Sequence, residues 1–223
     1  GIWGAQELQV REQLARRACG AVGRLLVETR WPELFRELGK EWPSLPPSPV
    51  KGDYVLVRPA TRRLDWQNET REPRAGYVEA ISRMVRRRGL RVVSAGWLDR
   101  KRERLVGGLP EADLRFERGE LELGQLLALA KGARLVVGAV GWIVPFGALW
   151  SRRPTLVVAG GQGGYNAPAV VVPPGTGEVM RWLIPTNYCG CRKKAHNCPK
   201  VIDDFEGKAE RALDELLGLS LPD

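Results

Sequence analysis

Residues 134–161 read RLVVGAVGWIVPFGALWSRRPTLVVAGG. Two short, mostly aliphatic segments, at 134–138 and 155–159, enclose a segment at 142–150 that is rich in aromatic and small residues. Each apolar run ends at or just before glycine. Apolar strands that alternate with helices are typical of a parallel sheet covered by helices on both faces. The stretch therefore predicts a strand, a short helix and a strand of an α/β domain.

The same alternation continues on both sides of this stretch. The further elements that we expect are strands at 54–57, 90–95 and 169–172 and helices at 73–88, 121–130 and 205–217. Parallel strands in one sheet are joined by right-handed crossovers, so this order gives one sheet with helices on both faces. The sequence predicts a Rossmann-like parallel sheet flanked by helices over residues 50–223.

The first 49 residues have a different character. An apolar stripe at helical spacing runs from Leu8 to Leu26, and a second short helix is expected at 33–42. Residues 43–49 read PSLPPSP and form a linker, because proline lacks the N–H donor that helices and sheets require. We therefore expect an N-terminal helical segment and linker over 1–49 before the α/β domain.

The charge balance favours anionic partners. The chain has 35 Lys and Arg against 26 Asp and Glu, a formal net charge of +9, and this excess favours phosphates, nucleic acid or acidic surfaces.

No window approaches the roughly 18 apolar residues of a membrane span, and the N-terminus does not read as a secretory signal. We expect a cytoplasmic protein without a membrane span. Few methionines and much arginine, leucine and proline indicate a thermophilic or GC-rich source.

Arginines and a threonine follow the first predicted strand of the α/β domain. Ligands of such sheets bind at the carboxyl ends of the strands. A hydroxyl, free backbone N–H groups and guanidinium groups at that place suit a diphosphate. The alternative is a solvated basic loop. The candidate phosphate ligands are Thr61, Arg62, Arg63, Arg71 and Arg74.

Glycines follow the other predicted strands at the same edge of the sheet. Glycine allows a ligand to approach the backbone closely, but it also makes ordinary turns. The sequence Gly-Gly-Gln-Gly-Gly at 160–164 predicts a ligand-facing loop, with a mobile surface loop as the alternative. The candidate donor-binding glycines are Gly96, Gly138, Gly141, Gly160 and Gly161.

Three of the four cysteines and the only histidine lie within ten residues of one another. Cys189, Cys191, His196 and Cys198 could close a tetrahedral zinc site of three thiolates and one imidazole. Zinc ribbons and knuckles favour two residues between the paired cysteines, and here there is one. A disulfide and reduced, merely structural cysteines therefore stay open as alternatives to structural zinc.

The order of these features resembles the C-terminal half of the heptosyltransferases, which are lipopolysaccharide glycosyltransferases of the GT-B fold. The resemblance rests on a strand that ends in Ala95-Gly96, on the runs at 134–138 and 154–158, and on the tail at 185–202. It covers residues 52–218. The resemblance implies a GT-B C-terminal-type domain that binds a nucleotide diphosphate sugar, from which the sugar is transferred.

The sequence also departs from this family. After the third strand the family has an Asp-Ser/Thr-Gly motif and then a histidine, whereas Ala139 and Val144 occupy these places here. Arg71 or Arg74 stands in for the lysine that follows the family's phosphate loop. The family's catalytic base usually comes from an N-terminal, acceptor-binding half, and about fifty residues are too few for it. A second chain or a missing N-terminal half would supply the acceptor site.

Three functions remain open on the sequence alone. The first is a glycosyltransferase, or its donor-binding half, in which the catalytic residues are unassigned. The second is a non-catalytic relative of the same fold that acts as a binding or structural module, since fold does not fix function. The third is a basic nucleic-acid-binding protein that uses its basic surface and the Cys/His cluster as a knuckle, although aromatic residues are not interleaved with the basic runs at 83–88 and 100–104.

Overall fold

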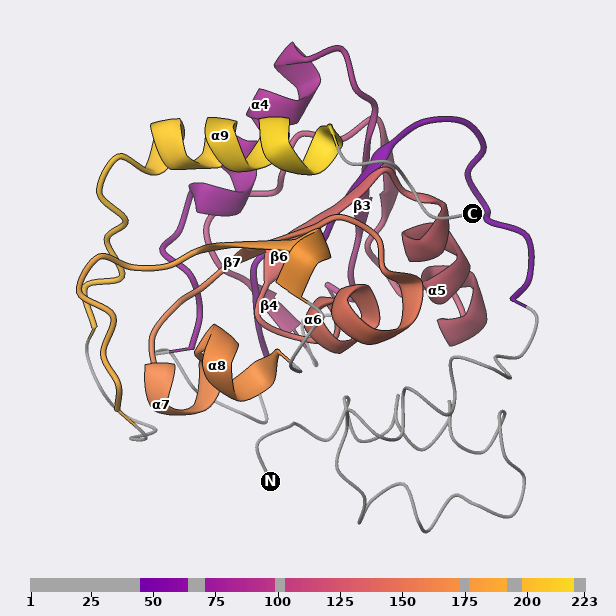
Figure 1. Cartoon of the computed structure of the whole chain (residues 1–223). Helices are drawn as coiled ribbons and strands as arrows, with labels where there is room; N and C mark the ends of the chain where they lie inside the picture. The colour runs from indigo at the N-terminus through magenta and orange to yellow at the C-terminus, as the bar shows by residue number, and fades with distance from the viewer. Residues whose placement is uncertain (1–44, 64–70, 99–102, 173–176, 192–197, 219–223) are drawn as a thin grey trace, which may run out of the picture.

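The computed structural model describes most of the predicted α/β domain (Figure 1). The described residues are 45–63, 71–98, 103–172, 177–191 and 198–218. The predicted helical segment and the first two residues of the linker, 43 and 44, lie outside this part of the chain. None of the helices in the described part is long and apolar enough to cross a membrane.

A six-stranded sheet forms the centre of the domain, with the order β5-β3-β1-β6-β7-β8. Its strands are β1 (Val55–Val57), β3 (Val92–Ala95), β5 (Leu114–Phe116), β6 (Leu135–Ala139), β7 (Thr155–Val158) and β8 (Met180–Leu183). All neighbouring pairs are parallel. Numbered by their appearance within the sheet, the strands have the order 3-2-1-4-5-6, which is the Rossmann order. The predicted fold class is confirmed.

Helices cover both faces of the sheet. The helices α4 (Tyr77–Arg87) and α9 (Phe205–Leu217) lie on one face, and α5 (Leu123–Gly132), α6 (Ile143–Pro145) and the π-helix η1 (Phe146–Ser151) lie on the other (Figure 1). Alternate residues of each strand point to opposite faces. In β1, Val55 and Val57 pack with α4 and α9, whereas Leu56 packs with α5 and α6. Burial on both faces explains why these strands read as unbroken apolar runs.

One predicted strand is wrong. Residues 169–172 lie largely in the helix α8 (Pro168–Val171), which follows the short helix α7 (Gly163–Asn166). Pro168 occupies the first turn of α8, where its missing N–H costs nothing and its fixed φ favours the helix. The last strand of the sheet is instead β8, which follows the 3₁₀ turn η2 (Gly177–Val179).

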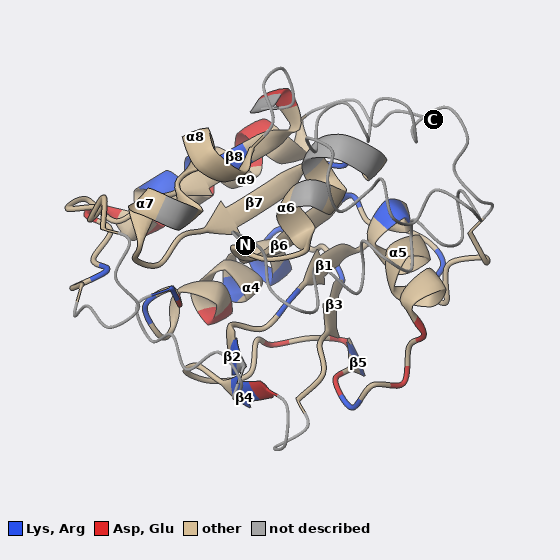
Figure 2. Cartoon of the chain, turned by 90° about the horizontal axis from the view of Figure 1, so that it is seen from below, with Lys and Arg blue, Asp and Glu red and all other residues tan. Residues whose placement is uncertain are grey.

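A small second sheet was not predicted. It pairs β2 (Thr61–Arg63) with β4 (Glu103–Leu105) in antiparallel register, with Arg62 opposite Arg104. It lies beyond the end of β1, apart from the main sheet (Figure 2). Its strands are three residues long and charged, so they lack the apolar pattern that predicts a strand.

Candidate functional site

The two central strands, β1 and β6, define where a ligand can bind. The chain leaves β1 toward β3 on one side and leaves β6 toward β7 on the other. Loops that diverge in this way leave room at the carboxyl ends of the two strands, and Rossmann-like proteins bind nucleotides there. We call this place the switch point.

Arg58, the first residue after β1, lies directly at the switch point. Its backbone N–H donates to the carbonyl oxygen of Val137 in β6 at 2.8 Å. A Cβ atom added at Gly138 would lie 3.1 Å from the Cβ atom of Arg58. Gly138 is therefore glycine because Arg58 packs closely against it.

The guanidinium group of Arg58 is held on two sides. Nη2 donates to Oε1 of Glu103 at 2.9 Å, and Nη1 donates to the hydroxyl oxygen of Thr61 at 3.2 Å. The side chain of Glu103 is 1% exposed and that of Arg58 is 15% exposed. This arrangement orients a cation at the end of β1, as anion recognition requires. The sequence predicted a ligand site in the loop 58–63 that follows this strand, but Arg58 itself was not among the predicted phosphate ligands. No sequence signal marked Glu103.

Arg62 makes a two-pronged ion pair with Glu72. Nη2 donates to Oε2 at 3.0 Å, and Nε donates to Oε1. Glu72 is buried, so its charge requires this partner. The alternative of a merely solvated basic loop therefore does not describe Arg62. The side chain of Arg63 lies outside the described part of the structure.

Arg71 reaches the switch point from the segment before α4. Its Nη2 donates to the carbonyl oxygen of Val140, the residue after β6, at 3.1 Å. Arg58 and Arg71 thus approach the junction of β1 and β6 from two different segments. Arg74 is exposed to solvent.

The predicted glycines have different surroundings. A Cβ atom at Gly160 would lie 2.1 Å from the carbonyl oxygens of both Arg71 and Glu72, so this glycine is required by the packing of the chain itself. A Cβ atom at Gly96 would make only ordinary contacts with Pro59, and one at Gly141 would make only an ordinary contact with the carbonyl oxygen of Ala139 at 3.9 Å. Gly160 and Gly161 are buried, so the alternative of a mobile surface loop is wrong for them.

Ala139 and Val144 lie at the two places where the resemblance implies an acidic residue and a histidine. Both are apolar, and Val144 is fully buried while Ala139 is 9% exposed. The end of β6 thus offers no polar side chain at these two places. Polar groups at the switch point come instead from Arg58, Thr61 and Arg71.

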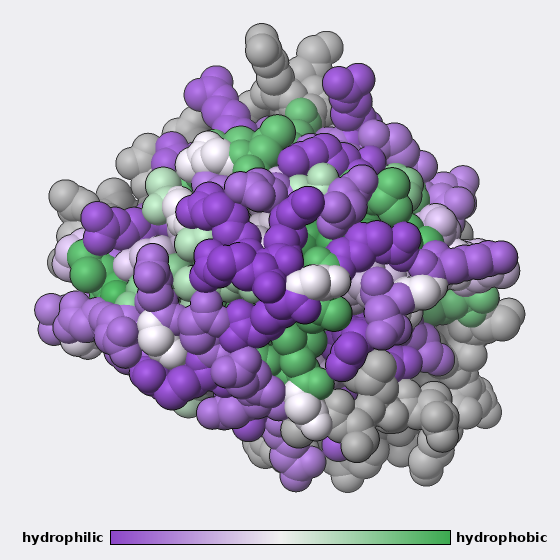
Figure 3. Space-filling model, turned by 90° about the horizontal axis from the view of Figure 1, so that it is seen from above, coloured by the Kyte–Doolittle hydropathy of each residue, from purple (hydrophilic) through white to green (hydrophobic). Residues whose placement is uncertain are grey.

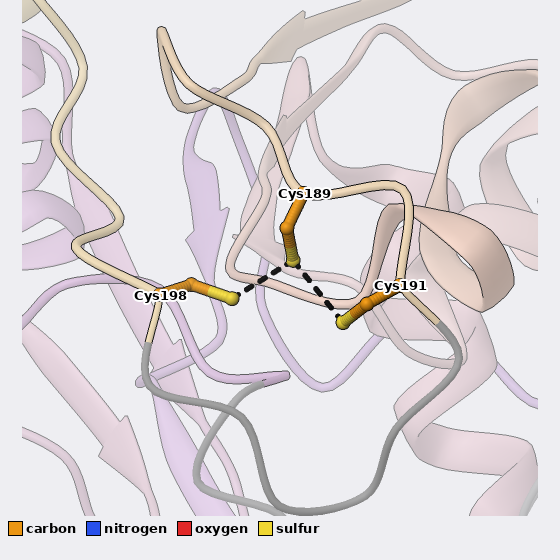
Figure 4. Close-up of side chains that lie close together, drawn as sticks. All are labelled: Cys189, Cys191 and Cys198. Carbon is orange, nitrogen blue, oxygen red and sulfur yellow. Dashed lines mark hydrogen bonds between the residues drawn. The ribbon is translucent and has the colours of Figure 1, made fainter.

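Three cysteines converge beyond the carboxyl end of β8 (Figure 4). The Sγ atom of Cys189 lies 3.3 Å from that of Cys191 and 2.8 Å from that of Cys198. All three Sγ atoms lie within 4.8 Å of one another. A zinc ion with bonds of about 2.3 Å to sulfur needs tetrahedral S–S separations of about 3.8 Å, which small side-chain movements provide. His196, the predicted fourth ligand, lies outside the described residues.

The cysteine cluster favours ionisation of one thiol. Burial opposes it, but hydrogen bonds from Cys198, Cys191 and the N–H of Gln162 together outweigh burial and lower the pKa of Cys189 to about 6. Burial and the neighbouring Cys189 raise the pKa of Cys198 to about 11. Burial, followed by the three nearby sulfurs, raises the pKa of Tyr188 to about 12. A cluster that carries a thiolate at neutral pH attracts a cation.

The described cysteines are free thiols. Their separations of 2.8 and 3.3 Å exceed the roughly 2.05 Å of a disulfide bond. Of the alternatives that the sequence left open, this geometry favours a thiol cluster over a disulfide.

Comparison with known proteins identifies the fold. A scan against protein-family models and a search of curated proteins each found no match. Among solved structures, the iron-containing dodecameric glycosyltransferase TibC from enterotoxigenic E. coli H10407 is 17% identical, with a TM-score of 0.50 over 78% of this chain and 48% of that chain. This chain has a glycosyltransferase-like fold.

Two further solved structures are similar to this chain, with lower TM-scores. E. coli ADP-heptose lps heptosyltransferase II is 14% identical, with a TM-score of 0.49 over 84% of this chain and 51% of that one. TibC in complex with ADP-D-beta-D-heptose is 15% identical, with a TM-score of 0.47 over 76% and 46%. The partial resemblance to heptosyltransferases that the sequence predicted is confirmed. The chain spans about half the length of these structures.

Replacing Gly160 tests the packing at this edge of the sheet. We expect Gly160→Ala to lower the free energy of unfolding by about 2 kcal/mol or more, because its methyl group would overlap two backbone carbonyl oxygens. The matched control is Gly141→Ala, whose methyl group makes one ordinary contact at 3.9 Å and changes stability by less than about 0.5 kcal/mol. Urea denaturation measures both, and equal effects would contradict the described packing.

Alkylation tests the ionisation of Cys189. Its pKa of about 6 means that the thiolate forms above pH 6 and is lost as the pH falls through 6. In metal-free protein, iodoacetamide should therefore modify Cys189 with a half-maximal rate near pH 6. Cys198, with a pKa of about 11, should stay unmodified at pH 7. Mass spectrometry of the labelled peptides distinguishes Cys189 from Cys198. Equal labelling of the two cysteines at pH 7 would contradict the assigned pKa values.

Proposed function

We propose that this chain is the donor-binding half of a glycosyltransferase and binds a nucleotide diphosphate sugar at the switch point. The observation that carries the proposal is the convergence of Arg58 and Arg71 on the ends of β1 and β6. Arg71 brings a cation to this place, and Arg58, whose charge is balanced by Glu103, adds oriented N–H donors; together they suit a diphosphate. The hydroxyl group of Thr61, which lies beside Arg58, adds a donor to the same site.

The proposed site supports one part of a transfer reaction. As the bond between the sugar and the diphosphate breaks, negative charge develops on the leaving diphosphate. Arg58 and Arg71 would stabilise this charge, and because Glu103 already orients Arg58, little reorganisation is needed. A general base that activates the acceptor hydroxyl would come from a second chain or from a further half of the protein. The other predicted ligands, Arg63 and Arg74, belong to the same proposal.

A specific observation favours a second function. Ala139 and Val144 replace polar residues of the heptosyltransferases, and both are apolar and buried. A domain that keeps the cations for the diphosphate but lacks these groups is suited to bind a nucleotide without transferring a sugar. Such a non-catalytic module would bind a nucleotide but transfer no sugar, even when the chain or half that supplies the acceptor site is present.

The surface of α4 does not favour nucleic acid as a partner. Three arginines of the basic run 83–88 lie in ion pairs with acidic side chains: Arg86 with Asp113, Arg87 with Glu210, and Arg88 with Glu210 and Asp214. Figure 3 shows a strongly hydrophilic surface over α4 and α9. Paired arginines release few counterions on binding phosphates, so their contribution to affinity is small.

We further propose that Cys189, Cys191 and Cys198 bind a structural zinc ion together with His196. Three thiolates and an imidazole are an established zinc ligand set, and thiolate ligands also suit iron. TibC is described as iron-containing, so metal analysis must measure both elements. The metal would stabilise the segment after β8 and take no part in sugar transfer.

Nucleotide binding tests the proposed site. We expect ADP to bind, and Arg71→Ala to weaken its affinity by about tenfold or more, because a charge-assisted hydrogen bond is lost. The matched control is Arg83→Ala, an exposed arginine on α4, which should change the affinity by less than about twofold. Isothermal titration calorimetry measures the three dissociation constants. Failure of the unaltered chain to bind any nucleoside diphosphate would refute the proposal.

Elemental analysis tests the metal site. The purified chain should hold about one zinc ion per molecule, because a closed structural site needs all four ligands. Cys198→Ser should lose it. Cys19→Ser replaces the one cysteine of the sequence outside the cluster and should retain it. Iron in place of zinc would correct the metal, and an absence of both would refute the site.

A further inference from the structure

The cysteine cluster is hydrogen-bonded to the glycine-rich loop that follows β7. We call residues 160–164 the glycine loop. The N–H of Gly163 donates to the carbonyl oxygen of Cys189 at 2.7 Å, and the N–H of Gly164 donates to that of Cys191 at 3.1 Å. Two consecutive amides of the loop thus bind the backbone of two candidate metal ligands.

A third hydrogen bond involves a sulfur atom directly. The N–H of Gln162 donates to Sγ of Cys189 at 3.3 Å. Gln162 has a φ of 59°, in the left-handed region that a non-glycine residue rarely adopts, and is 2% exposed. Such a conformation persists only where surrounding contacts fix it. The contact with Cys189 is one of them.

The glycine loop and the cysteine segment also pack without space between them. A Cβ atom at Gly163 would lie 2.7 Å from the carbonyl oxygen of Cys189 and 3.0 Å from the ring of Tyr188. The backbones of Cys189 and Gly163 are therefore in direct contact as well as hydrogen-bonded.

The other end of the glycine loop contacts the proposed nucleotide site. Gly160 packs against the backbone carbonyl groups of Arg71 and Glu72. The side chain of Arg71 in turn binds the carbonyl oxygen of Val140 at the end of β6. A continuous series of contacts therefore leads from Cys189 through the glycine loop to Arg71.

We propose that the cysteine cluster, when closed by a metal ion, fixes the glycine loop and thereby positions Arg71 for the nucleotide diphosphate. This inference rests on the proposed nucleotide site. Metal binding fixes the three sulfur atoms, and a rigid Cys189 carbonyl then fixes the N–H of Gly163.

Hydrogen–deuterium exchange of the full chain with zinc and with a chelator tests the coupling. Zinc should slow exchange of the amides of Gln162, Gly163 and Gly164 by about tenfold or more, because their hydrogen bonds open less often. The amides of α4 serve as the internal control and should not change. Zinc binding without slower exchange in the glycine loop would overturn the inference, as would a failure to bind zinc.

The affinity for ADP tests the positioning of Arg71. ADP should bind about tenfold more tightly to the zinc-loaded chain, because the site is then preorganised. Equal affinity with and without zinc would overturn the positioning role. If ADP binds to neither form, both the proposed function and the positioning role are refuted. The hydrogen–deuterium exchange experiment tests separately whether zinc is coupled to the glycine loop.

Two glycine variants separate coupling from metal binding. Gly163→Ala places a methyl group against the carbonyl oxygen of Cys189 and should force the segments apart while all three thiols remain. This variant should still bind zinc, but zinc should no longer tighten ADP binding. Gly190→Ala lies between two ligands, has open space at its Cβ position and should behave like the unaltered chain. An unchanged zinc effect in Gly163→Ala would overturn the inference. If Gly163→Ala fails to fold, the affinity of the unaltered chain for ADP with and without zinc still tests the inference.

Discussion

The parallel pairing of β1 with β6 is the constraint on which the rest of the structure depends. Val55, Leu56 and Val57 are fully buried between two helical layers, so β1 lies in the interior of the sheet and not at its edge. The chain must then build the sheet outward on both sides of β1 and β6, and the loops after these strands diverge. The place where Arg58 leaves the sheet follows from this topology and not from the loop sequence.

Buried carboxylates explain how arginines are held at that edge. Glu103 pairs with Arg58 and Glu72 pairs with Arg62, and both carboxylates are nearly inaccessible to water. Removing one partner of a buried pair leaves an unpaired charge that costs about 3–5 kcal/mol. Each pair therefore fixes a guanidinium group in one orientation. For Arg58 this orientation lies at the switch point, where an anionic ligand benefits from it.

The sequence predicted the main features of the fold because buried strands have unbroken apolar runs such as 135–137 and 156–159. It missed β5 and β8, mixed strands that contain Arg115 and Arg181. It also misread residues 169–172 as a strand, because a short apolar run fits a strand and a helix alike. The cysteine cluster could be predicted because its members are close in sequence. The pairing of Arg58 with Glu103 could not, since the two are 45 residues apart and only the tertiary fold brings them together.

A crystal structure of the chain with bound ADP would test the central claim most directly. The account predicts that the diphosphate lies at the carboxyl ends of β1 and β6, within hydrogen-bond distance of the guanidinium groups of Arg58 and Arg71. The space beside Gly141 would then be occupied by the ligand. A nucleotide bound elsewhere on the chain, with Arg58 and Arg71 in their present contacts and no phosphate between them, would contradict the account.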